Sequence, residues 1–204
     1  CWGGVDMESD APPGPFVLVD AGGRHGPDPY GHTCGIIESG EIRCWGDDRE
    51  GQLEKPSGAG WETVSAGARH SCAVDVLGAI ACWGADHLGQ FALPDRAWAD
   101  VGAGRDVTCA VDEDGGLFCT GDDIWGLVSE VPSAGYFVGV SVGEQHACAV
   151  TEDGELVCWG ENIWGSAGPM DFDAADPWER VTAGVNETCA VARSKRVGCW
   201  GQVL

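Results

Sequence analysis

The stretch HACAVTEDGELVCWG, residues 146–160, places two cysteines ten positions apart around a short Glu-Asp-Gly turn. The same C-x9-C spacing occurs five times in the 204 residues, and a self-similar spacing of this kind indicates a repeat architecture. The sequence therefore predicts an array of one unit. The paired cysteines are Cys34/Cys44, Cys72/Cys82, Cys109/Cys119, Cys148/Cys158 and Cys189/Cys199.

Other residues recur at fixed positions around each cysteine pair. Trp-Gly follows the second cysteine in four units, and Thr120-Gly121 stands there in the third. An aromatic residue stands eleven positions before the first cysteine in the last four units, and a small-residue pair ending in Gly lies between the two. The expected repeats cover about 16–60, 61–97, 98–135, 136–177 and 178–204, with 1–15 as the tail of a preceding repeat.

The unit has the composition of β-strands. Segments such as WETVSAG (61–67) and YFVGVSVG (136–143) are rich in β-branched and aromatic residues and end in Gly, whereas no helical apolar period extends beyond one turn. About four short strands per 40 residues with a Trp and Gly signature is typical of β-propellers. We expect an all-β propeller with five repeats plus an orphan terminal strand, forming an open arc or incomplete ring. Residues 26–31 and 169–177 are expected to be inserted loops.

The turn geometry brings each cysteine pair together. A three-residue loop Glu152–Gly154 with Gly in the left-handed position would pair Thr151 with Glu155. Counting back along the hairpin, Cys148 then faces Cys158 at a non-hydrogen-bonded site, where the Cα atoms are about 4.5 Å apart. This favours a cross-strand disulfide. Reduced cysteines between blades and a metal site remain alternatives, although structural zinc needs four ligands and each unit offers two thiols.

The segment AGARHSCAVDVLGAIACWGADHLGQ, residues 66–90, resembles the regulator of chromosome condensation repeat. The matching features are Ala-Gly-x-x-His-Ser, an aliphatic pair, a tight turn, Trp-Gly and Gly-Gln, and the resemblance extends over about 21–201. It implies a β-propeller, normally of seven blades. The chain is most similar to exported bacterial members with cysteines in the central hairpin, and it also resembles the bacterial β-lactamase-inhibitor propeller.

The charge limits the partners. Thirty-three acidic and eleven basic residues give a net charge of −22, which disfavours nucleic acid and anionic membranes and would steer a basic partner toward the chain. No run of about 18 apolar residues predicts a membrane span. Five disulfides would place the protein in an extracellular, cell-surface or periplasmic compartment. Cys1 is expected to mark the start of a fragment of a longer array, with a lipidated N-terminal cysteine as the alternative.

No catalytic constellation, cofactor site or metal site is predicted. His32, His70 and His146 each stand two positions before a first cysteine, a regularity that indicates a structural role between blades; Val107 and Glu187 occupy the same position elsewhere. The polar loops after Trp-Gly vary on a constant frame, so we expect a non-enzymatic surface that binds a protein. A carbohydrate-binding or glycan-active surface and a purely structural surface repeat are the alternatives. The candidate binding residues are Asp47, Asp48, Asp86, Asp122, Asp123, Trp125, Glu161, Asn162 and Trp164.

Overall fold

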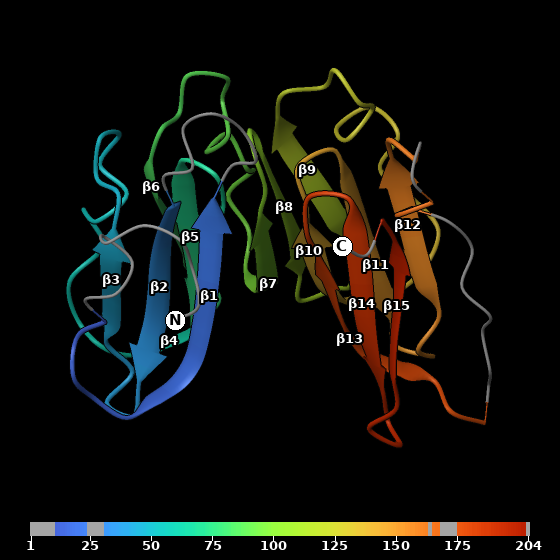
Figure 1. Cartoon of the computed structure of the whole chain (residues 1–204), viewed down its shortest axis with the longest axis horizontal. Helices are drawn as coiled ribbons and strands as arrows, with labels where there is room; N and C mark the ends of the chain where they lie inside the picture. The colour runs from blue at the N-terminus through green and yellow to red at the C-terminus, as the bar shows by residue number, and fades with distance from the viewer. Residues whose placement is uncertain (1–10, 24–30, 163–164, 168–174, 203–204) are drawn as a thin grey trace.

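The computed structural model describes residues 11–23, 31–162, 165–167 and 175–202, which form fifteen strands in five sheets (Figure 1). No helix in this described part has the length and apolarity to cross a membrane. The strands are β1 (Phe16–Gly23), β2 (Gly31–Ile37), β3 (Ile42–Gly46), β4 (Trp61–Ala66), β5 (His70–Asp75), β6 (Ile80–Gly84), β7 (Trp98–Ala103), β8 (Val107–Asp112), β9 (Leu117–Gly121), β10 (Phe137–Val142), β11 (His146–Thr151), β12 (Leu156–Gly160), β13 (Trp178–Ala183), β14 (Glu187–Ala192) and β15 (Val197–Gly201).

Each repeat forms one antiparallel sheet whose three strands follow one another in sequence. The predicted all-β propeller architecture is confirmed, but each sheet has three strands among the described residues rather than about four. The segment between β3 and β4 shows the reason, because it contains Gly51, Pro56, Gly58 and Gly60. Pro and Gly disfavour strand pairing, and the segment forms turns instead.

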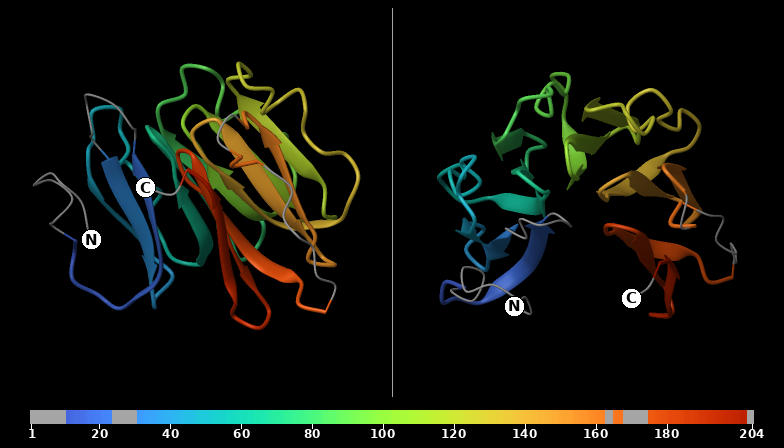
Figure 2. Two further views of the ribbon diagram at one scale, coloured as in Figure 1. Left: turned by 45° about the vertical axis from the view of Figure 1, so that its right-hand side comes forward. Right: turned by 45° about the horizontal axis from the view of Figure 1, so that its top comes forward.

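The five sheets stand side by side as the blades of an open arc. The first strands of neighbouring blades contact one another in the order β1, β4, β7, β10, β13, so these strands line the centre. The first and last blades lie apart (Figure 2). The orphan terminal strand was expected within the first fifteen residues, of which 1–10 lie outside the described part. Most of the two expected loops, 26–31 and 169–177, also lies outside it.

The hairpin of β11 and β12 has the predicted geometry. Thr151 N donates to Glu155 O at 2.9 Å, and Gly154 closes the turn with a φ of 83°. Cys148 faces Cys158 with a Cα–Cα distance of 4.0 Å, and the two cysteines form a disulfide. Hairpin length and register together therefore determine the bridge. The other four predicted pairs are disulfides in the same register, namely Cys34–Cys44, Cys72–Cys82, Cys109–Cys119 and Cys189–Cys199.

The two cysteines of a bridge differ in burial, which the sequence pattern did not predict. The first cysteine is fully buried in each of the first four blades. By contrast, Cys44, Cys82 and Cys119 are half-buried and pack at the margins of three hydrophobic clusters. The reason is their place in the sheet, because the first cysteine lies on the middle strand and the second on the outer strand. The middle strand is covered on both edges, so its sulfur is the better protected of the two.

The hydrophobic core lies between the blades. At the first boundary Ile36 and Ile42 of one blade pack with Val64, Ala73 and Trp83 of the next. Phe16 pairs with Ile37 in the register that joins Trp61 to Asp75 in the second blade, so Phe16 is the first repeat's counterpart of the recurring aromatic residue. The segment inserted between β1 and β2 hides this equivalence in the sequence.

A row of glycines sets how closely the inner strands approach each other. A Cβ atom on Gly22 would collide with the carbonyl oxygen of Gly67, and one on Gly67 would collide with that of Gly104. The same relation joins Gly104 to Gly143 and Gly143 to Gly184. Four boundaries thus require glycine for lack of space, which explains the recurring small-residue pair ending in Gly.

Candidate functional site

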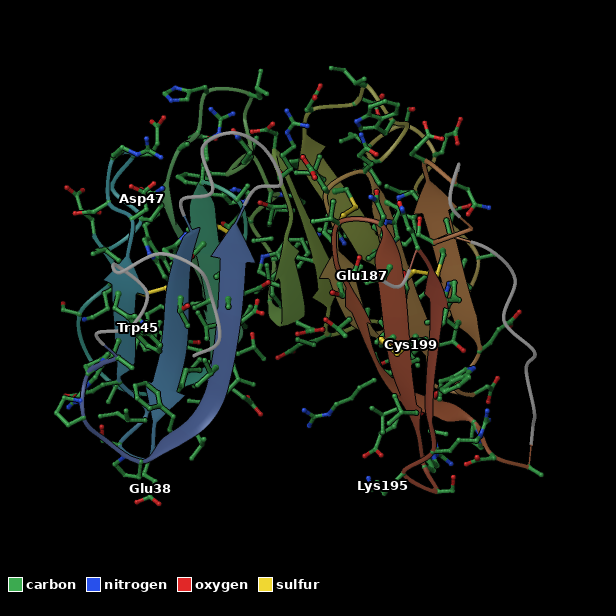
Figure 3. The ribbon with its side chains drawn as sticks, viewed as in Figure 1. Glu38, Trp45, Asp47, Glu187, Lys195 and Cys199 are labelled. Carbon is green, nitrogen blue, oxygen red and sulfur yellow. A yellow bond between two sulfur atoms is a disulfide. The ribbon has the colours of Figure 1, made fainter. Side chains whose placement is uncertain are left out.

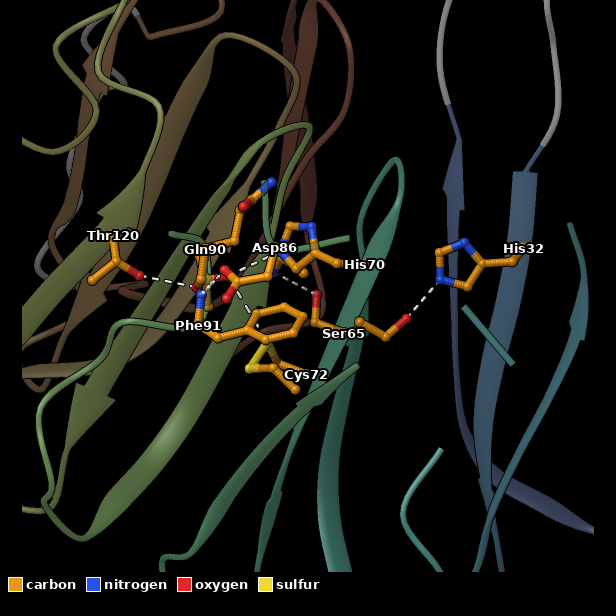
Figure 4. Close-up of a disulfide and its surroundings, with 12 residues drawn as sticks. His32, Ser65, His70, Cys72, Asp86, Gln90, Phe91 and Thr120 are labelled. Carbon is orange, nitrogen blue, oxygen red and sulfur yellow. Dashed lines mark hydrogen bonds between the residues drawn. A yellow bond between two sulfur atoms is a disulfide. The ribbon is translucent and has the colours of Figure 1, made fainter. Parts of the chain in front are cut away.

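Three of the four blade boundaries carry the same buried hydrogen bond. His32 Nε2 lies 2.6 Å from Ser71 Oγ, His70 Nε2 lies 2.9 Å from Thr108 Oγ1, and His146 Nε2 lies 2.7 Å from Thr188 Oγ1. Each histidine belongs to one blade, and its partner belongs to the next. Figure 4 shows His32 and His70 in the first two blades. These histidines are structural, as predicted, although they contact side-chain hydroxyls rather than the backbone. We call each pair a latch.

The latches hold neutral histidines. Burial lowers the pKa of all three imidazoles to about 4. Their Nδ1 atoms are buried without a partner among the described residues. A buried N–H without an acceptor is rarer in proteins than an unused lone pair, so we place the proton on Nε2, which donates to the hydroxyl. At the last boundary the Thr188 hydroxyl donates in turn to the carbonyl oxygen of Ser166 at 2.9 Å.

The boundary between the third and fourth blades lacks the latch. Val107 stands at the histidine position, 3% exposed, and Ala147 stands at the hydroxyl position, fully buried. The two polar partners are therefore lost together, and neither is left unpaired in the core. Losing only one would leave a buried polar group without a partner, which costs about 1–3 kcal/mol.

The loops after β3, β6, β9 and β12 share a rigid frame. In each loop a side-chain oxygen accepts a backbone N–H from five residues later, at 2.8–2.9 Å. The indole N–H of Trp83 donates to Gln52 O at 2.7 Å, and Trp159 and Trp200 bind Leu127 O and Ser166 O in the same way. Thr120, which replaces Trp in the third blade, donates to Gln90 O at 3.0 Å. The residues that accept within their own loops are Asp48, Asp86, Asp123 and Asn162.

These contacts divide the predicted binding residues into two groups. In each of the four loop acceptors, one side-chain oxygen accepts a hydrogen bond from the backbone of its own loop. Asn162 forms this bond in the same way as the three aspartates, so the role needs no charge. For Asp123, hydrogen bonds from Ser129 and Val128 also lower the pKa of the carboxyl. Asp47 is buried and contacts Arg49 and Gln52.

The remaining candidates that the structure describes are all half-buried. Asp122 and Glu161 are half-buried at equivalent positions of the third and fourth loops. Trp125 is half-buried and packs against the hydrophobic cluster of the third and fourth blades. Trp164 lies outside the described residues. Asp122 and Trp125 are therefore the two candidates that the structure brings together, and with Val107 and Leu127 they line one small cavity.

All of these loops lie at one end of the arc. Figure 3 shows Asp47 toward one end and Glu38 and Lys195, which belong to hairpin turns, toward the other. We call the end with the loops after Trp-Gly the loop rim, and the end with the hairpin turns the hairpin rim. The short turns between β4 and β5, β7 and β8, and β10 and β11 also lie at the loop rim and carry Arg69, Arg105, Asp106 and Glu144.

Those turn residues form a chain of ion pairs across three blades. Arg69 contacts Asp106 at 2.6 Å, and Arg105 contacts Asp106 at 3.4 Å and Glu144 at 3.1 Å. Asp106 is 9% exposed, so the pairs are partly shielded from water. Sequence reasoning missed this chain because the residues come from different repeats and the residue type changes at each position: Arg69 is equivalent to Asp106, and Arg105 to Glu144.

The central channel has a different chemistry toward the hairpin rim. A cavity of about 650 Å³ lies between the inner strands. Asp20 accepts from Ser65 Oγ at 3.0 Å and from Ala66 N at 2.8 Å, and burial raises its pKa. Burial also raises the pKa of Asp100 to about 6, although that carboxylate accepts from Val140 N at 2.9 Å. These carboxylates serve to join neighbouring inner strands.

Comparison with known proteins agrees with the repeat. A family model described as "Regulator of chromosome condensation (RCC1) repeat" matches residues 137–163. No curated protein sequence matches the chain. The match covers one repeat of the chain, the one that contains the hairpin of β11 and β12.

Solved structures share the fold. The chain is similar to yeast RCC1 in its complex with Kap60, with 17% identity and a TM-score of 0.71, over 92% of this chain and 56% of that one. The ectodomain of the receptor kinase CR4 from the moss Physcomitrella patens gives 24% identity and a TM-score of 0.67, over 85% of this chain and 50% of that one. The ectodomain of ACR4 from Arabidopsis thaliana gives 23% and 0.66, over 91% and 63%. The chain thus spans between half and just under two thirds of these structures.

Proposed function

We propose that this chain is a non-catalytic protein-binding propeller of an exported protein, and that its loop rim is the binding surface. The observation that carries the proposal is the loop frame. The same side-chain and indole hydrogen bonds recur in successive blades, whereas the residues between them change from loop to loop. A rigid scaffold that presents variable loops is the usual construction of a recognition surface.

The charge of the rim supports a basic partner. The chain has a net charge of −22, and Asp122 and Glu161 remain half-buried on the loop rim beside the acidic residues that hold the loops. A surface with an excess of negative charge attracts cationic partners and raises the association rate at low salt. Exposed carboxylates contribute little affinity on their own, so apolar contacts must supply the rest.

The disulfides support export. The first cysteines of the first four blades are fully buried, so the bridges are part of the blade boundaries. Stable bridges of this kind belong to oxidising compartments outside the cytosol. Among the similar structures, two are ectodomains of receptor kinases and one is a complex of yeast RCC1 with Kap60, which is consistent with an extracellular setting and with protein binding for this fold.

Two exposed leucines of the second blade allow a matched test of the rim. Leu88 lies in the loop after β6, 49% exposed, and Leu77 lies in the hairpin turn between β5 and β6, 83% exposed. A photo-crosslinking phenylalanine analogue replaces one or the other, and each variant is irradiated in the culture medium and surface extract of its native source. We expect proteins bound covalently from position 88 and none from position 77.

Crosslinks from position 77 alone would move the binding surface to the hairpin rim. Products that are glycans, or binding that periodate treatment of the extract abolishes, would favour the carbohydrate-binding alternative. The absence of any product from both positions would favour a structural repeat and contradict the proposed function.

A further inference from the structure

The third blade departs from the repeat at adjoining positions of the loop rim. Val107 and Ala147 replace the histidine and hydroxyl of a latch. Leu127 replaces the glutamine that follows the loop glycine in the first two blades, where Gln52 and Gln90 are buried and accept a loop N–H at 2.8 and 2.9 Å. Side chains that form a boundary hydrogen bond and a loop hydrogen bond in other blades are thus replaced by apolar side chains at one place. Local departures of this kind are expected where a protein has a function.

A cavity lies beside these replacements. It has a volume of about 210 Å³, and the buried side chains of Val107 and Leu127 form an apolar part of its wall. Trp125, half-buried, adds an aromatic surface, and Ile124, 74% exposed, adds a further apolar side chain. Cavities that bind drug-sized molecules span about 300–1,000 Å³, so this volume suits one amino-acid side chain.

The charges around the cavity favour a cation. Arg105, Asp106, Asp122 and Glu144 also line it. Arg105 already contacts Asp106 and Glu144, and Asp106 has Arg69 as a second partner, so the charges of these two cations and two anions balance. Asp122 has no Lys or Arg partner in the described part of the chain, where it accepts a hydrogen bond from Ile124 N at 3.3 Å. One carboxylate is therefore uncompensated.

We propose that this cavity, here called the third-blade pocket, binds a Lys or Arg side chain of a protein partner. The inference rests on the proposed protein-binding function and adds the chemistry of its anchor. The methylene stem contacts Val107, Leu127 and Trp125, while the cationic head group pairs with Asp122. Lys and Arg side chains combine an apolar stem with a charged end, and a tryptophan ring attracts cations as well as packing on the stem.

The probes are pentapeptides with one variable residue. Acetylated and amidated Gly-Gly-Lys-Gly-Gly and Gly-Gly-Arg-Gly-Gly are titrated into the isotopically labelled chain, with the norleucine peptide as the uncharged control. The readouts are the indole N–H resonance of Trp125 and the fitted dissociation constant. We expect both cationic peptides to shift this resonance and to bind roughly threefold to tenfold more tightly than the norleucine peptide.

Two sets of variants locate the site. Asp122→Ala copies Ala85, the residue at that loop position in the second blade, and should remove the preference for the cationic peptides. The triple variant Val107→His, Ala147→Thr, Leu127→Gln introduces a latch and the glutamine of the first two blades, and should fill the pocket and abolish binding. Glu38→Ala, which removes an exposed carboxylate at the hairpin rim, is the control and should leave binding unchanged.

Three results would overturn the inference. They are equal binding of the norleucine peptide, unchanged binding by both Asp122→Ala and the triple variant, or shifts of equal size around every loop, as a general effect of the acidic surface would give. The photo-crosslinking result at position 88 is independent of these outcomes. Crosslinks formed from position 88 together with any one of these three results would leave the loop rim as the binding surface and exclude only the pocket as its anchor.

Discussion

His70 Nε2 lies 2.9 Å from Thr108 Oγ1 across the boundary between the second and third blades, with both residues fully buried. The next boundary has Val107 and Ala147 at the same two positions. The chain therefore contains both a polar and an apolar solution to the same packing problem. Because one boundary of the chain already has Val and Ala at these positions, variants of His70 and Thr108 can copy them, and the contribution of the latch to stability can be measured.

The latch should behave as a coupled pair. His70→Val leaves the Thr108 hydroxyl buried without its partner, and Thr108→Ala does the same to the imidazole, so each single variant should lose about 1–3 kcal/mol of unfolding free energy. The double variant copies Val107 and Ala147 and should lose less than the sum of the two. Urea unfolding of the four proteins gives the coupling energy, which we expect to be on the order of 1 kcal/mol. Additive losses would show that the two side chains do not act as a pair.

The latches should make the fold sensitive to acid. Burial lowers the pKa of His32, His70 and His146 to about 4, below the value of about 6.5 for an unfolded chain. Between these values the unfolded state binds more protons, so this part of the stability is present above pH 6.5 and is lost as the pH falls toward 4. The double variant His70→Val, Thr108→Ala should lose less stability than the parent between pH 7 and pH 4.5. Equal losses would mean that His70 titrates alike in both states.

Asp100 should have the opposite pH dependence. Burial raises its folded-state pKa to about 6, so the folded state holds the proton more tightly and stability falls as the pH rises from about 4 through 6. Asp100→Asn removes the charge and keeps an oxygen that accepts from Val140 N. We expect this variant to match the parent at pH 4 and to exceed it at pH 7.5 by at most about 3 kcal/mol. Asp100→Ala, which lacks the acceptor, is the control and should be less stable than Asp100→Asn at both values.

The glycine row should tolerate no side chain where two blades meet. A Cβ on Gly22 would overlap the carbonyl oxygen of Gly67, whereas among the described residues a Cβ on the adjacent Gly23 would meet only Gly31 Cα at 3.7 Å, an ordinary contact. Gly22→Ala should therefore cost about 1–3 kcal/mol, as overpacking does in cores. Gly23→Ala should change stability by less than about 0.5 kcal/mol. Thermal unfolding compares the two, and similar melting temperatures would show that the blades can move apart without cost.

The five disulfides should differ in their reactivity toward reductant. In the first four blades the first cysteine is fully buried against the following blade, whereas Cys199 is exposed and Cys189 is half-buried on the last blade of the arc. A phosphine reductant at low concentration should open Cys189–Cys199 first. Alkylation followed by peptide mapping measures the order, and reduction in 8 M urea is the control, in which the order should disappear. Simultaneous opening of all five bridges in the native state would contradict the protected position of the other four.

Much of the fold could be predicted from the sequence. The C-x9-C spacing and the Glu152–Gly154 turn determine the register of the hairpin, because side chains alternate along a strand and the turn fixes which residues face each other. Disulfides, strand order within a blade and the structural histidines follow from this local geometry. The repeat of about 40 residues then predicts identical units side by side, since a single three-stranded sheet cannot bury its faces alone.

Only the tertiary structure decided what lies between the blades. The residues that meet there are about 40 positions apart in the sequence, so no local pattern predicts their contacts. Examples are His70 with Thr108, Gly67 with Gly104, and Arg105 with Glu144. The structure changed the interpretation of the candidate binding residues most. Four of them accept hydrogen bonds within their own loops, namely Asp48, Asp86, Asp123 and Asn162. By contrast, Val107 and Leu127 line the third-blade pocket, although they are apolar and a sequence search for reactive or charged residues does not select them. The sequence by itself determined the blade, because hairpin geometry is local. The surface between blades depended on three-dimensional packing, because its partners come from different repeats.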